Sequence, residues 1–287
     1  MMRTTLEIAM PTRLSALLLS AAACISLSGF SLFARADIVE LLPRIKPAIA
    51  GVGTVHPTRT PRIKLSGTGF VVADGRHVIT NAHVPPSTIE EDKGETIAVF
   101  LRGPDGIIVR KAEKVASDPE HDLLLLKMEG TPVPALKIDD SPRAREGQLY
   151  YFTGYPIGAV LGLHPATHRA GLAAIAPVFS PPPNTRNLTA KLIKRAEDSF
   201  LIYQLDATAY PGNSGSPLYD GETGEVIGVI NSVFVKGAKE NVLRDPSGIT
   251  YAIPAKYVNA LLEKAGLAGV GSINGGVNAA PTPFLRR

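Results

Sequence analysis

The chain has 287 residues, 45% of them hydrophobic and 20% charged, with a formal net charge of +4. This is an ordinary globular balance, with enough apolar material for a sizeable core without disulfides. The small positive excess does not indicate nucleic-acid binding. The single cysteine, Cys24, lies in the first 36 residues, so the rest of the chain cannot form a disulfide, a thiolate metal site or a cysteine-protease centre.

The first 36 residues have the pattern of a secretory signal peptide. Two arginines precede an apolar stretch from Leu14 to Phe33, and the small-residue pattern Ala34–Ala36 follows it. This order predicts export, with cleavage after Ala36. Two alternatives stay open. The apolar stretch is close to the roughly 20 residues that span a bilayer, which would make it an uncleaved anchor, and Cys24 could be a lipid attachment site.

From about residue 52 the chain alternates short apolar runs with turn signals, a pattern typical of an all-β sandwich or barrel. Helices are expected at Asp37–Ile49 and Pro254–Ala265, the latter on the helical spacing of its apolar residues. The Pro-rich segment Ala176–Ser199 indicates a long functional loop, and residues 266–287 a disordered tail. The expected strands are Gly69–Ala73, His77–Thr80, Ile97–Arg102, Ile107–Arg110, Leu123–Met128, Leu149–Thr153, Phe200–Asp206, Glu225–Val235 and Gly248–Ile253.

Three segments carry residues suited to nucleophilic catalysis. His83 follows an apolar strand, Asp122 opens a run of four leucines, and Ser214 lies in a glycine-flanked loop. A serine hydroxyl needs a base to take its proton as it attacks, and histidine has the right basicity. A buried carboxylate can then hold the imidazole and stabilise its charged form. These residue types together predict a catalytic triad of His83, Asp122 and Ser214, with Asp118 as a weaker candidate for the acid.

The loop around Ser214 also predicts an oxyanion hole. Its glycines let the backbone fold closely around the serine, so that amides point at the charge that develops during attack. The expected residues of this hole are Gly212, Asn213 and Ser214.

TNAHV at 80–84, DLLLLK at 122–127 and GNSGSPL at 212–218 resemble the three signature blocks of trypsin-like serine proteases. GTGFVV at 67–72, GYP at 154–156 and YAIPAK at 251–256 resemble, more narrowly, the HtrA/Deg type. The resemblance implies an all-β, chymotrypsin-type fold of two six-stranded antiparallel β-barrels, at about residues 50–140 and 145–255, with short N-terminal and C-terminal helices. The expected domains are a signal peptide (1–36), a protease domain (37–265) and a tail (266–287).

The resemblance also implies a function. It predicts a periplasmic or secreted serine endopeptidase that forms an acyl-enzyme and acts on unfolded or misfolded envelope proteins. The expected partners are polypeptides and, by analogy, two further copies in a homotrimer. Neither nucleic acid nor, after signal cleavage, stable membrane association is expected, and no metal or cofactor is expected. Two alternatives stay open: a secreted protease of narrow specificity, and a non-catalytic binding module that keeps the protease fold.

The sequence departs from the HtrA/Deg pattern in four places. Ser216 and Leu124 replace small residues that are common two positions after the serine and the aspartate. The Ala176–Ser199 segment lies where regulatory loops are expected, and the short stretch after Glu263 leads us to expect no PDZ domain. The resemblance places two segments at the specificity pocket, and because Thr208 stands where an acid would select basic residues, we expect small or medium apolar residues before the scissile bond. The pocket residues are Thr208, Ala209, Tyr210, Ile230, Asn231 and Ser232. The remaining histidines, expected on the surface, are His56, His77, His121, His164 and His168.

Overall fold

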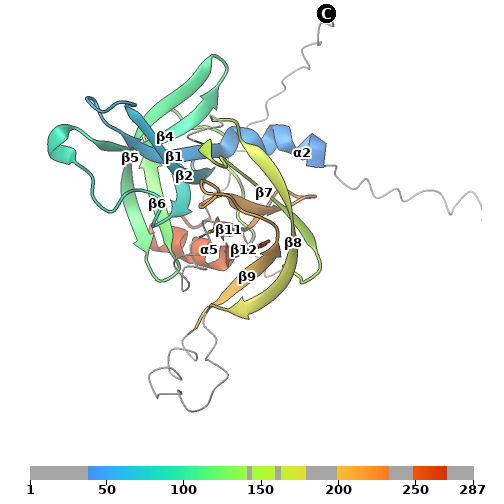
Figure 1. The fold of residues 1–287 in the computed structure, drawn as a ribbon. Helices are drawn as coiled ribbons and strands as arrows, with labels where there is room; N and C mark the ends of the chain where they lie inside the picture. Colours follow the sequence, from blue (N-terminus) through green and yellow to red (C-terminus); the bar gives the residue numbers. More distant parts are fainter. Residues whose placement is uncertain (1–37, 141–143, 159–162, 179–198, 233–247, 270–287) are drawn as a thin grey trace, which may run out of the picture. The chain divides into compact units, whose positions relative to one another are not determined.

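The computed structural model describes residues 38–140, 144–158, 163–178, 199–232 and 248–269. These ranges all belong to one compact unit, Ala36–Arg287 (Figure 1). The expected signal peptide and its cleavage site, most of the Ala176–Ser199 loop and most of the 266–287 tail lie outside the described residues.

The first half of the unit is a closed antiparallel barrel with the strand order β1-β2-β3-β6-β5-β4 (Figure 1). Its interior is filled by alternate strand residues, among them the fully buried Val52, Val78 and Val99. The strands are β1 (Ile49–Val55), β2 (Ile63–Val72), β3 (His77–Asn81), β4 (Thr96–Gly103), β5 (Gly106–Asp118) and β6 (Leu123–Met128).

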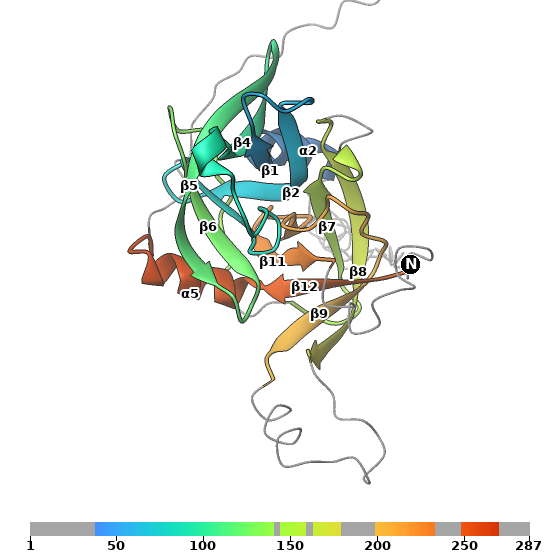
Figure 2. The same cartoon turned by 60° about the vertical axis from the view of Figure 1, so that its left-hand side comes forward.

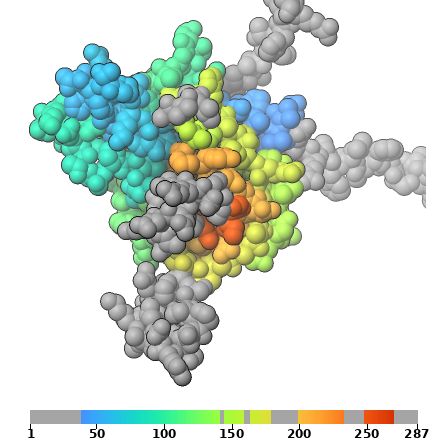
Figure 3. All heavy atoms as spheres, in the orientation of Figure 1, coloured from blue at the N-terminus to red at the C-terminus, as the bar shows by residue number. Residues whose placement is uncertain are grey.

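The second half is another closed antiparallel barrel, with the order β10-β11-β12-β9-β8-β7. A separate cluster of buried residues fills it, including Phe152, Leu172 and Leu205. In the space-filling view, the first barrel in blue and green and the second in yellow and orange form adjoining surfaces (Figure 3). The strands are β7 (Leu149–Gly154), β8 (Ala166–Pro177), β9 (Leu201–Asp206), β10 (Pro217–Asp220), β11 (Val226–Asn231) and β12 (Ile249–Pro254). The two six-stranded barrels confirm the expected fold class.

A helix lies at each end of the described chain. Helix α2 (Ile38–Ile45) buries Leu41 and Ile45, and a short 3-10 helix η1 (Lys46–Ala48) follows it. Helix α5 (Ala255–Lys264) buries Val258 and Leu261 and lies beside β5 and β6 of the first barrel (Figure 2). Neither α2 nor α5, the helices of the described ranges, has the length and apolar character needed to cross a membrane.

Three strands were not expected from the sequence, and β2 and β5 are longer than expected. The N-terminal helix was expected to continue through Ile49, but there the chain enters β1, which pairs with both β2 and β4. β8 and β10 were not predicted. β8 has weak apolar alternation of its own and is defined by its pairing with β7 and β9, which shows tertiary pairing overriding a weak local pattern.

Candidate active site

Pairing of β3 with β6 brings His83 next to Asp122. Asn81 and Leu123 are register partners, so the turn that follows β3 meets the residue that precedes β6. Nδ1 of His83 lies 2.5 Å from Oδ2 of Asp122, and the backbone amide of His83 donates to Oδ1 at 3.0 Å. The carboxylate therefore contacts the histidine twice, which fixes both the position and the tilt of the imidazole.

The backbone of Asp122 is held in a conformation that few side chains adopt. Its φ is +53°, a left-handed geometry that costs an L-residue about 1–2 kcal/mol. Two hydrogen bonds to its carbonyl oxygen help to offset this strain, from the backbone amide of Ala82 at 3.1 Å and from Nδ2 of Asn81 at 3.1 Å. This conformation turns the carboxylate toward His83 instead of along the direction of β6.

Asn231, expected in the specificity pocket, contacts the carboxylate of Asp122. Its Nδ2 donates to Oδ2 of Asp122 at 2.7 Å, and the residue is fully buried at the end of β11. Oδ2 thus accepts from Asn231 as well as contacting the imidazole. Because Asn231 belongs to the second barrel, the position of the carboxylate depends on how the two barrels meet.

The loop that carries Ser214 is tied to the first barrel through Thr68. Oγ1 of Thr68 donates to the carbonyl of Gly212 at 2.6 Å, and the amide of Thr68 donates to the carbonyl of Ser214 at 2.9 Å. The same Oγ1 accepts the amide of Tyr155 at 3.0 Å. The carbonyl of Thr68 accepts from Oγ1 of Thr80, in the strand that leads toward His83, at 2.6 Å. One β2 residue therefore connects the serine loop, the residue that follows β7 and the strand before His83.

Two backbone amides in this loop donate to no group in the described part of the chain, namely those of Gly212 and Ser214. The amide of Asn213 is occupied by the carbonyl of Tyr210 at 3.0 Å, and that of Gly215 by the carbonyl of Ile230 at 2.9 Å. Amides of residues i and i+2 with no internal partner are what an oxyanion hole requires. Of the three residues expected there, Asn213 separates the two donors, and its own N–H is not one of them.

The hydroxyl of Ser214 contacts Ser232. The two Oγ atoms are hydrogen-bonded, and the amide of Ser232 lies 3.4 Å from the Oγ of Ser214. Among the described residues no hydrogen bond joins Ser214 to His83. Nucleophile–base hydrogen bonds are often long or misaligned without substrate.

The other expected pocket residues lie at one end of the second barrel. Thr250 fixes the segment before the serine loop, because its Oγ1 donates to the carbonyl of Ala207 at 2.7 Å and accepts the amide of Ala209 at 2.8 Å. Tyr210 is 40% exposed, whereas Ile230 is fully buried in the barrel core. Thr208 lies in this fixed segment, between Ala207 and Ala209.

Two of the remaining histidines do not lie on the surface, where the sequence analysis expected them. His56 and His77 are buried instead of exposed. His77 contacts Asp74 at 2.7 Å, which helps to lower the pKa of that carboxyl against the opposing effect of its own desolvation. His164 is exposed beside Arg102.

His121 contacts Asp118 at 2.6 Å, so the weaker acid candidate pairs with His121 and does not contact His83. Its ring also stacks on Tyr257 of α5, with ring centroids 3.8 Å apart.

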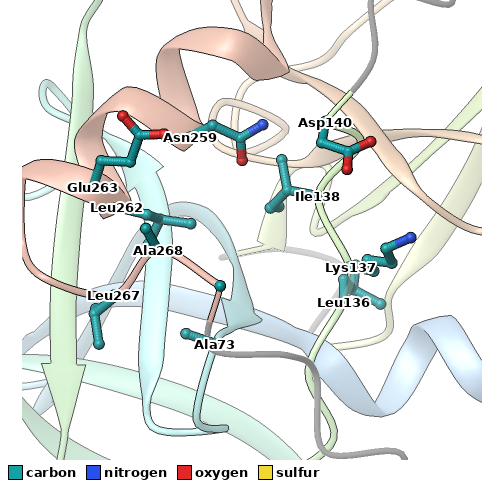
Figure 4. Close-up of a pocket in the computed structure, with 11 residues that line it drawn as sticks. Ala73, Leu136, Lys137, Ile138, Asp140, Asn259, Leu262, Glu263, Leu267 and Ala268 are labelled. Atoms are coloured by element: carbon teal, nitrogen blue, oxygen red, sulfur yellow. The ribbon is translucent and has the colours of Figure 1, made fainter.

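A cavity on another part of the molecule is lined by none of the predicted triad residues. It lies between α5 and the segment Leu136–Asp140, and Asn259, Leu262 and Leu267 contribute to its lining (Figure 4).

Comparison with known proteins identifies the family to which the chain belongs. The family model of the trypsin-like peptidase domain matches residues 67–229. The chain is 28% identical over 199 residues to a protein of Marinomonas sp. (strain MWYL1) named "Probable periplasmic serine endoprotease DegP-like", covering 69% of this chain and 35% of that protein. A protein of the same name from Pseudomonas putida (strain GB-1) is 27% identical over 196 residues, covering 66% of this chain and 32% of that protein.

Among solved structures, the crystal structure of the serine endoprotease from Yersinia pestis has the same fold, with a TM-score of 0.54 and 23% identity over 80% of this chain and 66% of that one. This chain spans about a third of the length of the two curated relatives described above. The family match covers more than half of the chain, including His83, Asp122 and Ser214, the three residues of the predicted triad. The chain belongs to the trypsin-like peptidase family and is homologous to DegP-like serine proteases.

Proposed function

We propose that this protein is a serine endopeptidase that uses Ser214 as nucleophile, His83 as general base and acid, and Asp122 as the group that orients the histidine. The observation that carries the proposal is the joint geometry of the site. The site combines a His83–Asp122 pair with a 2.5 Å contact and a loop in which the amides of Gly212 and Ser214 have no partner among the described residues. The adjacent residues Asn231 and Ser232 contact Asp122 and Ser214 respectively.

In the first half-reaction, Oγ of Ser214 attacks the carbonyl carbon of the scissile peptide bond. Nε2 of His83 takes the hydroxyl proton as the new C–O bond forms, and the charge on the carbonyl oxygen is stabilised by the two free amides. His83 then returns the proton to the leaving amine, and the C–N bond breaks. An acyl-enzyme on Ser214 remains.

In the second half-reaction, water takes the place of the amine. His83 removes a proton from the water, which attacks the ester carbonyl, and then returns the proton to Oγ of Ser214 as the acid product leaves. Throughout, Asp122 stabilises the imidazolium without itself becoming protonated. Removal of one oxyanion donor in such a site typically costs about 3–4 kcal/mol in the transition state.

The substrate class and location are part of the same proposal. The relatives named as DegP-like are periplasmic serine endoproteases, and the N-terminal 36 residues have the pattern of an export signal. We therefore place the protein in the periplasm or outside the cell, acting on unfolded or misfolded polypeptides. A trimeric assembly rests on the resemblance to HtrA/Deg proteins alone.

The proposal is tested by labelling the purified protein with a fluorophosphonate, which reacts with activated serines. We expect labelling of the natural protein and its complete loss in Ser214→Ala. Ser216→Ala is the matched control, because this serine lies two residues away with a buried Oγ that has no hydrogen-bond partner among the described residues; it should still be labelled. An unlabelled natural protein, with and without an unfolded substrate present, would contradict the proposal and favour the non-catalytic binding module.

The breadth of the substrate range is tested with unfolded casein. A protease of misfolded proteins should degrade casein to many fragments, with no degradation by Ser214→Ala. A labelled enzyme that leaves casein intact would instead indicate the narrow-specificity alternative.

A further inference from the structure

The side chain of His168 faces the interior of the second barrel. Along β8 the even-numbered residues Ala170 and Leu172 are buried in the barrel core, and His168 shares their face of the strand. Its register partner in β7 is the fully buried Phe152. The two rings stack with centroids 4.7 Å apart and an interplanar angle of 14°. This contact fixes the orientation of the imidazole.

The Nε2 atom of His168 is shielded from solvent and has no hydrogen-bond partner among the described residues. Buried polar atoms are nearly always paired in native proteins, so an unpaired one calls for an explanation. Burial also lowers the pKa of His168, which favours a neutral ring at pH 7. A neutral imidazole protonated on Nε2 presents one N–H donor to whatever occupies the space in front of it.

His168 lies behind the segment that precedes the serine loop. Its ring centroid is 6.4 Å from that of Tyr210, and Ala209 packs against the same core cluster that contains Phe152. This segment, Thr208–Tyr210, is the expected wall of the pocket for the substrate residue before the scissile bond. The unpaired Nε2 therefore lies in the barrel core beside that wall.

We propose that His168 is a specificity-determining residue, whose Nε2–H donates to the side-chain oxygen of a glutamine or glutamate that precedes the scissile bond. The inference rests on the proposed endopeptidase function. Three of the expected pocket residues, Thr208, Ala209 and Ile230, carry no charge that would pair with a lysine or arginine of the substrate. A neutral imidazole matches an uncharged carboxamide, so glutamine is the favoured residue and glutamate the second. This preference differs from the small or medium apolar residues that the sequence predicts, because His168 adds a polar group beside the pocket wall.

The experiment compares fluorogenic peptides that differ only in the residue before the scissile bond: Gln, Glu, Met or Leu. Met has nearly the length of Gln but no amide, so the Gln-to-Met ratio of kcat/KM isolates the hydrogen bond. Because sites built to hydrogen-bond a substrate group reject analogues that lack it, we expect a ratio of about 10 or more. The Glu peptide, measured from pH 5 to 8, separates a carboxylate preference from a carboxamide preference.

Three variants connect the ratio to His168. His168→Phe keeps a ring that can stack on Phe152 but lacks the donor, and should bring the Gln-to-Met ratio close to one. His168→Gln restores an N–H donor and should recover part of the preference. His164→Phe changes an exposed histidine that precedes β8 and should leave the ratio unchanged. Thermal melts of each variant show whether the barrel is intact.

A natural enzyme that cleaves the Met or Leu peptide at least as well as the Gln peptide would overturn the proposal, as would an unchanged ratio in folded His168→Phe. If no peptide is cleaved, the endopeptidase proposal fails, but the role of His168 can still be tested by measuring peptide binding. Fluorescence anisotropy of the same peptides on Ser214→Ala should show tighter binding of Gln than of Met, lost when His168→Phe is added. Equal affinities would refute the role of His168.

Discussion

The side-chain amide of Asn231 donates to Oδ2 of Asp122 at 2.7 Å, across the boundary between the two barrels. The same oxygen contacts Nδ1 of His83 at 2.5 Å. The carboxylate is thus held by a first-barrel histidine and a second-barrel amide that lies 109 residues further along the chain. Any change that separates the barrels should disturb the orientation of His83 before it disturbs either barrel core.

Replacement of Asn231 should impair catalysis more than folding. Asn231→Ala leaves Oδ2 of Asp122 with one contact fewer, and a hydrogen bond to a charged group contributes about 1.5–3 kcal/mol. We expect kcat to fall by about 10-fold or more with KM little changed, because Asn231 acts on the carboxylate and not on the substrate. Steady-state kinetics with a cleaved peptide measure the split.

Asn259→Ala is the control for this effect. Nδ2 of Asn259 donates to the carbonyl of Asp139 at 2.9 Å, a comparable amide contact on α5 and outside the triad. Its loss should lower the melting temperature without the fall in kcat. Equal kinetic losses in the two variants would show that Asn231 has no special relation to the triad.

A methyl group at Gly212 should abolish the oxyanion hole. Gly212 has φ of +98°, and a Cβ there would lie 2.3 Å from the carbonyl oxygen of Tyr155. The loop would have to move, taking one free amide with it, so fluorophosphonate labelling of Gly212→Ala should fall by about 100-fold or more. Gly147→Ala has a similar φ of +83° but open space around the Cβ. It should cost only about 1–2 kcal/mol of stability and retain labelling, and a labelled Gly212→Ala would refute the assignment.

The contact between Ser214 and Ser232 should restrain the nucleophile. Oγ of Ser214 is hydrogen-bonded to Oγ of Ser232 and has no hydrogen bond to His83 among the described residues. Ser232→Ala removes that competing bond, whose net contribution is about 1 kcal/mol, and should speed labelling by about 5-fold. Ser216→Ala again serves as the serine control. Slower labelling of Ser232→Ala would mean that Ser232 supports the nucleophile instead of restraining it.

Glu95 should make the first barrel sensitive to acid. Its carboxylate accepts from Oγ1 of Thr54 at 2.7 Å, from the amide of Glu90 at 3.1 Å and from Nη1 of Arg59 at 2.7 Å. These bonds, with that from Thr54 the largest cause, lower the pKa of Glu95 from 4.5 to about 2. Between about pH 2 and pH 4.5, Glu95 is therefore protonated in the unfolded chain but ionised in the folded chain. Stability from Glu95 is therefore fully present above about pH 4.5 and is lost as the pH falls toward 2.

Glu95→Gln should flatten this dependence. Urea unfolding midpoints measured from pH 7 to pH 2 should fall less steeply for Glu95→Gln than for the natural protein, starting from a lower value at pH 7. Glu91→Gln, in the exposed turn nearby, should leave the curve unchanged. Parallel curves for the natural protein and Glu95→Gln would contradict the role given to these hydrogen bonds.

The sequence by itself determined the features that short contiguous patterns encode. The leucine run gave β6 its bounds, Leu123–Met128, as expected, because a fully buried strand needs an uninterrupted apolar stretch. His83 and Asp122 stood out for the same reason, each following or opening such a strand. The turn and strand signals predicted an all-β sandwich or barrel, and the resemblance to trypsin-like proteases implied two barrels.

Only the tertiary structure decided what depends on a partner far along the chain. β1 and β8 have weak local patterns and take their conformation from pairing with strands on both sides. The contact of Asn231 with Asp122 was not expected, and His168 was expected on the surface but faces a barrel core. The physical reason is common to all four: closing a barrel sets which face of each strand is inside and which distant side chains meet, and residue type and local spacing carry no record of either.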